Sequence, residues 1–317
     1  MHTDGATENV LAVQVPSAQP SSRWYSGSGI FRNVYLVVTG PVHVARHGTF
    51  VTTPDLESSL RSGYAAVQVQ TDVANDGGVA ATVDLALTIT DPRRPAGQGT
   101  ATVSVPAGQA QSATVTVNVS NPALWSTESP SLYTVRTELS AGGTAVDVTT
   151  IPFGIRYFGF DPGAGFSLNG QPVKLQGVDL HATEGAIGAA VRYDALVHQM
   201  ELMRSMGVNA LRTAHNPPAP ELVQVCEQLG ILMMVEAFDC WHTGKLPFDY
   251  HLYFDQWSDY DIAEMVHAAK NSPAVVLWSI RSETPDTGLP GGPAIAQRLI
   301  ADIKAVDTTR PVVMVVS

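Results

Sequence analysis

Short apolar strands alternate strictly with amphipathic helices after Phe153, and this alternation restricts the fold more than any other feature of the chain. The strands are almost continuously apolar, as parallel strands are when helices cover both faces of their sheet. In chain order the segments read VKLQGVDL, YDALVHQMELMRSMG, VNALRT, PELVQVCEQLG, ILMMVEAF, YDIAEMVHAAKN, AVVLWSI, GPAIAQRLIADIKAV and RPVVMVV. No glycine-rich phosphate-binding loop follows the first strand, so the pattern favours a (β/α) barrel over a doubly wound sheet.

Residues 64–147 follow a different rhythm, in which Val, Thr and Ala alternate with polar residues between turn signals. The segments are YAAVQVQTDVAND, VAATVDLALTITD, TATVSVPAGQAQSATVTVNVS and SLYTVRTELSAGG. A period of two with one apolar face predicts antiparallel strands, and about seven of them in this length are typical of an immunoglobulin-like sandwich. Such a module most often serves as a packing or spacer domain.

The charge balance excludes several classes of partner. The chain carries 18 Lys and Arg against 29 Asp and Glu, a net charge of −11, so we expect neither nucleic acid nor a membrane as its partner. Cys226 and Cys240 have no metal-binding spacing, and we expect no metal and no cofactor. The first thirty residues show no secretory signal, which slightly favours a cytoplasmic location and leaves localisation open.

Polar side chains gather where the predicted parallel strands end. Carboxyl ends of parallel strands meet at one edge of a sheet, and in a barrel this edge carries the active site. The candidates are His181 after the first strand, Arg212, His215 and Asn216 after the second, Glu236, Asp239 and Trp241 after the third, and Ser282 and Glu283 after the fourth. We therefore expect a polar concave floor that binds a small molecule.

Three segments resemble the barrel of glycoside hydrolase family 2, especially its β-galactosidase-like members. They read GVDLHATEGAIG, NALRTAHNPPAPELVQVCEQLGILMMVEAFD and NSPAVVLWSIRSE, and RWYSGSGIFRNVYL is similar to the end of the jelly-roll domain that comes first in that family. The resemblance implies a multidomain β plus α/β chain: the end of a jelly-roll sugar-binding domain at 1–48, an immunoglobulin-like sandwich at 49–155, and an incomplete (β/α)8 TIM barrel, with about its first five strands, at 156–317.

The family resemblance also implies hydrolysis of β-linked sugars with retention of configuration, by an acid/base and a nucleophile about 5 Å apart. Glu283 matches the acid/base, and the neighbouring Trp278 is expected to give it apolar surroundings that favour the protonated form. Arg212 matches the arginine that holds active-site carboxylates. The remaining matched positions are implied to bind the sugar, with Trp241 as a stacking face and Glu236 as either a ligand or a scaffold; they are His181, His215, Asn216, Glu236, Asp239 and Trp241.

Two departures from the family pattern leave a second interpretation open. Arg281 and Ser282 replace a glycine and an asparagine, and serine is too short to reach the sugar hydroxyl that the asparagine binds. Compared with the family, the chain is also expected to be truncated at both ends, without the nucleophile segment. The open barrel edges then require a homodimer or a missing barrel segment to cover them. The alternative to a hydrolase is an inactive or repurposed family member that binds carbohydrate, acts as a scaffold, or has changed chemistry.

Overall fold

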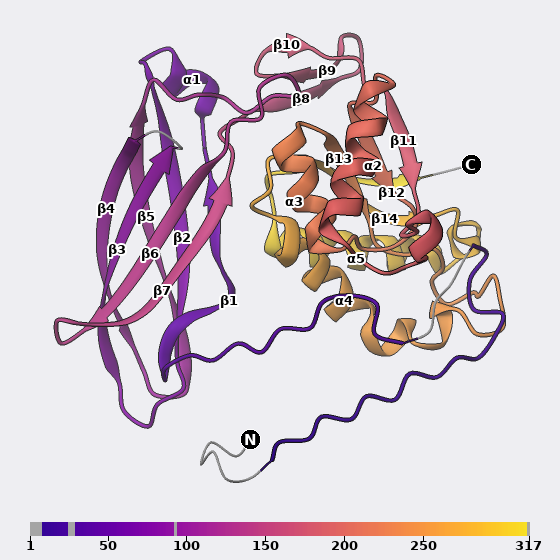
Figure 1. The fold of residues 1–317 in the computed structure, drawn as a ribbon, viewed down its shortest axis with the longest axis horizontal. Helices are drawn as coiled ribbons and strands as arrows, with labels where there is room; N and C mark the ends of the chain where they lie inside the picture. Colours follow the sequence, from indigo (N-terminus) through magenta and orange to yellow (C-terminus); the bar gives the residue numbers. More distant parts are fainter. Residues whose placement is uncertain (1–7, 25–28, 92–93, 316–317) are drawn as a thin grey trace.

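The computed structural model describes residues 8–24, 29–91 and 94–315. A β-sandwich and a β/α domain make up most of this part of the chain, and a small sheet follows the sandwich in sequence (Figure 1). Antiparallel sheets therefore come first and a parallel β/α segment comes last, which confirms the predicted fold class.

The sandwich consists of two antiparallel sheets, with the strand orders β1-β2-β5 and β4-β3-β6-β7. Its strands are β1 (Val42–Thr52), β2 (Tyr64–Asn75), β3 (Ala81–Asp91), β4 (Arg94–Val105), β5 (Gln109–Ser120), β6 (Tyr133–Ala141) and β7 (Thr144–Phe153), and the short helix α1 (Leu56–Leu60) joins β1 to β2. On β3, Val83, Leu85, Leu87 and Ile89 are at most 1% exposed. The period of two in the sequence thus places every second side chain in the core between the sheets.

A parallel sheet forms the centre of the β/α domain, and its strands lie in chain order. They are β11 (Gly177–Leu180), β12 (Ala210–Thr213), β13 (Leu232–Glu236), β14 (Val275–Ser282) and β15 (Val312–Val315). The helices that alternate with them are α2 (Tyr193–Ser205), α3 (Pro220–Leu229), α4 (Phe254–Ala269) and α5 (Gly292–Val306), with short 3₁₀ turns η1 (Gly185–Ile187), η2 (Tyr250–Leu252) and η3 (Pro285–Gly288). Neighbouring strands that follow one another through a helix are typical of a (β/α) barrel.

Helix α3 shows how the local sequence sets the ends of these elements. It begins at Pro220, whose fixed φ suits the first helical turn, and it ends at Gly230 with a left-handed φ of 74°. A Cβ atom at Gly230 would lie 2.5 Å from the carbonyl oxygen of Thr127, so the sandwich side of the molecule approaches the helix end closely. None of the described helices is both long enough and apolar enough to cross a lipid bilayer.

Specific hydrogen bonds join the sandwich to the β/α domain. Asn271, which follows α4, accepts from the Val51 N–H and donates to the Thr49 carbonyl, both at 2.9 Å and both on β1. Trp125 lies in the connection between β5 and β6, and its indole N–H donates to the carbonyl of Glu227 on α3 at 2.8 Å. The sandwich and the β/α domain therefore pack through specific hydrogen bonds. A small sheet also connects them, and its strands are β8 (Phe158–Asp161), β9 (Gly165–Leu168) and β10 (Gln171–Pro172).

The segment ahead of β1 is extended and contains no strand or helix in residues 8–24 and 29–41. In Figure 1 it runs along the lower side of the β/α domain before it enters the sandwich. Arg32 donates to the Pro217 carbonyl at 2.6 Å, and Asn33 donates to the carboxylate of Glu221 on α3. Strand β1 begins at Val42, ahead of the boundary expected at residue 49, and the assignment of 1–48 to a jelly roll stays a prediction.

Candidate active site

The parallel register brings the predicted site residues of neighbouring strands side by side. Asp179 on β11 pairs with Arg212 on β12, and Glu236 on β13 pairs with Ser279 on β14. These positions lie at or near the carboxyl ends of their strands, where a (β/α) barrel places its active site. The strands that the sequence predicted thus converge on one cluster of polar side chains.

Glu236 is at the centre of this cluster, and its side chain is completely buried. Arg212 binds both oxygens of the carboxylate, with distances of 3.0 Å from Nε to Oε2 and 2.9 Å from Nη2 to Oε1. His215 Nδ1 lies 2.8 Å from Oε1, and the Ser279 hydroxyl donates to Oε2 at 2.8 Å. A buried carboxylate is stable only with such partners. Both oxygens are engaged, so Glu236 occupies the position of a scaffold that holds Arg212 and His215.

Arg212 connects this buried carboxylate to the open side of the site. Its third nitrogen, Nη1, donates to Asp179 Oδ2 at 3.2 Å, and the Asp179 side chain is 56% exposed. The planar guanidinium thereby joins the ends of β11, β12 and β13. Asp179 was not among the sugar-binding candidates, although its place before His181 in the sequence is compatible with this contact.

Two histidines and a tryptophan from a distant segment form an aromatic cluster over the strand ends. The Trp24 ring lies 4.7 Å from the ring of His181 and 5.5 Å from that of His215, and the two histidine rings lie 5.2 Å apart. Burial lowers the pKa of His181, and the neighbouring His215 lowers it further. A neutral imidazole here is suited to hydrogen bonding with a sugar hydroxyl. Trp24 was not predicted to belong to this site, because it precedes the whole sandwich in the chain.

Asp239 accepts hydrogen bonds from two cations, one nearby in the sequence and one from the segment ahead of the sandwich. Lys245 Nζ lies 2.8 Å from Asp239 Oδ1 and Arg23 Nη2 lies 2.7 Å from the same oxygen. The bond to Asp239 raises the pKa of Arg23. Lys245 also donates to the Ser282 carbonyl at 2.8 Å, which fixes the peptide that precedes Glu283. Arg23 and Lys245 were both missed by sequence reasoning, because a lone cation in a loop carries no distinctive pattern.

Glu283 is exposed and lies just beyond the end of β14. Its backbone has a left-handed φ of 48°, which a residue other than glycine adopts only where its surroundings hold it. The preceding residue supplies these restraints: the Ser282 N–H donates to the Phe238 carbonyl at 2.8 Å, and the Ser282 carbonyl accepts from Lys245. The neighbouring residues therefore hold the backbone of Glu283 in place while the residue stays exposed.

Trp241 and Trp278 lie in the core, which differs from the surroundings expected for them. Both side chains are completely buried. The Trp241 indole donates to the Ile280 carbonyl at 3.2 Å, so it offers no exposed face for stacking on a sugar. The Trp278 indole donates to Asp307 at 2.8 Å, at the end of α5, and therefore lies on the helix side of the sheet. Glu283 does not have the apolar surroundings that a neighbouring Trp278 was expected to provide.

A cavity of about 640 Å³ adjoins the cluster, and its walls include Trp24, Asn216 and Asp239. This volume is sufficient for a sugar residue. Arg212, His215 and Glu283 do not line it, so the cavity lies beside the buried network. Within the part of the chain that the structure describes, no group of three or more His, Cys, Asp or Glu side chains is arranged to hold a metal ion.

Comparisons with known proteins agree with this architecture. The glycosyl hydrolases family 2 TIM barrel domain matches residues 163–317, and the glycosyl hydrolases family 2 model matches residues 42–156. Among curated proteins, the chain is 39% identical over 277 residues to beta-galactosidase BoGH2A of Bacteroides ovatus, covering 87% of this chain and 32% of that protein. It is 28% identical to a beta-glucuronidase of Bacteroides fragilis, covering 89% of this chain and 41% of that protein.

Solved structures show the same likeness. A glycosyl hydrolase family 2 member from Bacteroides cellulosilyticus matches with a TM-score of 0.89 and 36% identity, covering 93% of this chain and 38% of that one. A beta-glucuronidase of Bacteroides uniformis matches with a TM-score of 0.79 and 26% identity, covering 95% of this chain and 38% of that one. The chain spans less than half the length of these relatives. Both parts of the chain and its fold match the same family, and the chain belongs to glycoside hydrolase family 2.

Proposed function

We propose that this protein takes part in the hydrolysis of a β-linked glycoside of the β-galactosidase type, with retention of configuration, and that Glu283 donates the proton to the leaving oxygen. The observation that carries the proposal is the network in which Glu236 holds Arg212 and His215 at the strand ends of the same sheet whose strand β14 leads into the exposed Glu283. Fixed cations and hydrogen-bond donors at strand ends are suited to hold sugar hydroxyls and to stabilise charge in the transition state.

The proposed proton transfer requires a carboxyl group that reaches solvent and substrate. Glu283 meets this condition because it is exposed, and the bonds to Ser282 hold its backbone in place. In the first step a nucleophilic carboxylate forms a bond to the sugar carbon while the bond to the glycosidic oxygen breaks and that oxygen takes the proton of the Glu283 carboxyl. In the second step water attacks the sugar carbon, the bond to the nucleophile breaks, and the Glu283 carboxylate takes the proton of the water.

The retaining mechanism also needs a nucleophilic carboxylate. Glu236 has both oxygens bound to Arg212, His215 and Ser279, and Asp239 is bound to cations, so we assign the role to neither of them. We propose that the nucleophile comes from outside these 317 residues, in keeping with the greater length of the relatives. Residues of a longer polypeptide satisfy this requirement.

A second candidate function is sugar binding without hydrolysis, and the pair Arg281–Ser282 favours it. They replace the glycine and the asparagine of the family pattern, and serine is too short to reach the sugar hydroxyl that the asparagine binds. Ser282 contributes its backbone to the loop through bonds to Phe238 and Lys245, and its short side chain is 1% exposed. A binding protein keeps the polar floor and does not need the proton donor.

Hydrolysis of aryl β-galactosides and β-glucuronides tests these two functions. The full-length polypeptide that includes these 317 residues, its Glu283→Gln variant and the control Glu201→Gln, an exposed glutamate on α2, are compared on substrates with good and poor leaving groups. Only poor leaving groups need protonation, so Glu283→Gln should lower their turnover by about 10²-fold or more and leave dinitrophenyl glycosides much less affected. An equal loss on both kinds of substrate contradicts the role of Glu283. Binding of a β-galactoside without turnover by the wild type favours the second candidate.

A further inference from the structure

A second cavity, of about 540 Å³, lies between the sandwich and the β/α domain. One of its walls is the outer face of strands β1 and β2. Thr52 pairs with Gln68 across this antiparallel ladder, and Phe50 pairs with Gln70. Along β2 the two glutamines alternate with Val69, which is completely buried in the core of the sandwich. Side chains alternate between the faces of a strand, so these four lie on the face opposite the core and form one wall of the cavity.

The opposite wall consists of loops that precede two strands of the parallel sheet. Asn271 and Pro273 lie ahead of β14, and Thr308 and Arg310 lie ahead of β15. The hydrogen bonds that Asn271 makes with β1 hold the two walls together. These loops are at the amino ends of the parallel strands, whereas the cluster around Glu236 is at their carboxyl ends. The cavity is therefore separate from the candidate active site.

Arg156, between β7 and β8, lines this cavity with part of its guanidinium unbound. Its Nε and Nη2 donate to the carbonyls of Pro273 and Val275 at 2.9 and 2.7 Å, and the group lies 4.5 Å from the centre of the Phe158 ring. Its Nη1 has no hydrogen-bond partner among the described residues, and protein atoms do not enclose it. The guanidinium is thus held in place while these N–H donors remain free toward the cavity.

No carboxylate in the walls neutralises Arg156, because none of the described residues that line the cavity is Asp or Glu. Asp307 favours the charged form of Arg156 but already binds Arg310 at 2.8 Å. Burial lowers the pKa of Arg156, and the charge of Arg310 lowers it further. By contrast, acidic side chains such as Asp239 line the cavity beside the candidate active site. In a protein with a net charge of −11, the second cavity is a local region of positive charge.

Neutral donors surround this charge from several directions. The Gln68 amide and the hydroxyls of Thr52, Thr53 and Thr308 line the cavity and make no side-chain hydrogen bond with any described residue. Together with Arg156 they come from the β1–β2 wall, the segment after β7 and the loop ahead of β15. A tetrahedral oxyanion directs its oxygens to several sides, whereas a planar carboxylate presents two oxygens in one plane. The arrangement therefore suits a tetrahedral group.

We propose that this cavity is a second binding site, which takes a phosphate or sulfate group with Arg156 as its anchor and Gln68 as a neutral donor. The volume of about 540 Å³ leaves room for a small polar molecule that carries the group, such as a sugar phosphate. The bound group contacts both the sandwich and the β/α domain. The inference goes beyond the proposed function and does not depend on it.

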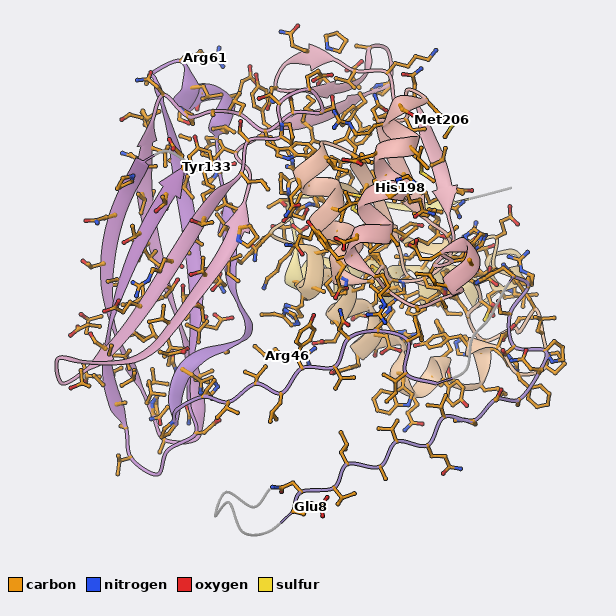
Figure 2. The ribbon with its side chains drawn as sticks, viewed as in Figure 1. Glu8, Arg46, Arg61, Tyr133, His198 and Met206 are labelled. Atoms are coloured by element: carbon orange, nitrogen blue, oxygen red, sulfur yellow. The ribbon has the colours of Figure 1, made fainter. Side chains whose placement is uncertain are left out.

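Calorimetric titration of the full-length polypeptide that includes these 317 residues tests the proposal. The ligands are inorganic phosphate, inorganic sulfate, glucose 6-phosphate and neutral glucose, at constant ionic strength. The proteins are the wild type, Arg156→Gln, Arg156→Lys and Gln68→Glu, with Glu283→Gln and Arg204→Gln as controls. Arg204 is exposed on α2, two positions before Met206, which Figure 2 shows well apart from the sandwich.

We expect the wild type to bind phosphate or sulfate with a Kd of about 1 mM or lower, and glucose at least about tenfold more weakly than glucose 6-phosphate. Arg156→Gln should weaken oxyanion binding by about tenfold or more, because a charge-assisted contact is lost, and Arg156→Lys should keep part of the affinity. Gln68→Glu should weaken it by about tenfold as well, because it places a carboxylate in the cavity. Both controls should stay within about twofold of the wild type.

The ligand series also identifies the source of the group. A preference for phosphate over sulfate, or the reverse, shows which oxyanion the site takes. Tighter binding of glucose 6-phosphate than of inorganic phosphate shows that a larger molecule carries the group, and equal binding shows that the site takes the free ion.

Failure of the wild type to bind either oxyanion overturns the proposal, and so does equal affinity for glucose and glucose 6-phosphate. Binding that is unchanged in both Arg156→Gln and Gln68→Glu, or that is lost in Glu283→Gln, places the oxyanion elsewhere and also overturns it. Thermal unfolding checks that each variant folds. Gln68→Glu keeps the contacts of Arg156 with the two carbonyls, so it tests the cavity even where Arg156→Gln is destabilised. Hydrolysis plays no part in these titrations, so this inference and the proposed function fail separately.

Discussion

The stability of this protein should fall as the pH rises from 5 to 8, because of one buried carboxyl group on α3. Glu227 is 5% exposed, and burial raises its pKa from the ordinary 4.5 to about 7. The folded state therefore keeps the proton to a higher pH than the unfolded chain does. The stabilisation is complete below about pH 4.5 and is lost as the pH rises through about 7. At about 1.4 kcal/mol per pH unit, the interval from 4.5 to about 7 sets an upper limit of about 3 kcal/mol on the loss in the free energy of unfolding.

Urea unfolding at pH 5 and pH 8, followed by tryptophan fluorescence, measures this effect. The amide of Glu227→Gln does not ionise. The free energy of unfolding should therefore fall between pH 5 and pH 8 by about 1–3 kcal/mol more in the wild type than in Glu227→Gln. The control Glu201→Gln changes an exposed glutamate on α2 and should follow the wild type. The same pH dependence in the wild type and Glu227→Gln would refute the assignment of the proton to Glu227.

Three further substitutions test other contacts by urea unfolding. Glu236→Ala leaves the largely buried Arg212 with only the exposed Asp179 as an anionic partner, so it should destabilise the fold by about 3 kcal/mol; a loss below about 1 kcal/mol contradicts the scaffold role. Asn271→Ala removes two hydrogen bonds between the sandwich and the β/α domain and should cost about 1–3 kcal/mol, whereas no change would mean that water replaces both bonds. Gly230→Ala should cost more than about 1 kcal/mol, because it strains the left-handed backbone and drives a Cβ atom against Thr127; a neutral effect would show that the helix end shifts freely.

The order of strands and helices was predictable because it depends on local patterns. On β3 the alternation of apolar and polar residues sets which side chains enter the core, and on α3 Pro220 and Gly230 set the two ends. The meeting of Arg212 and Glu236 was also predictable, because parallel strands end at one edge of the sheet. Such features need only short stretches of sequence and a known sheet type.

The orientation of single side chains at the strand ends was less predictable. Trp278 precedes Glu283 by five residues, yet its indole binds Asp307 on the helix side of the sheet. Trp241 was placed in the right loop, but its ring is enclosed by the core instead of facing a ligand. An aromatic residue in a strand-end loop fits the core and the site equally well in the sequence, and tertiary packing decides between them.

Contacts between distant segments had no local signal at all. Arg23 meets Asp239 across 216 positions of the chain, and Trp24 covers His181 and His215 from ahead of the sandwich. The left-handed backbone of Glu283 depends in the same way on Lys245, which binds the preceding carbonyl. Only the folded arrangement reveals these residues as parts of the site.

The extended segment ahead of the sandwich has a consequence for any attempt to divide this protein into working parts. A fragment that starts after the sandwich keeps Asp179, Arg212, Glu236 and Glu283, yet it loses both Trp24 and the second cation on Asp239. Trp24, which packs against His181 and His215, thus belongs to the segment that passes beside the β/α domain before the sandwich begins. Shortening the protein from its amino end removes part of the site before it reaches the first strand.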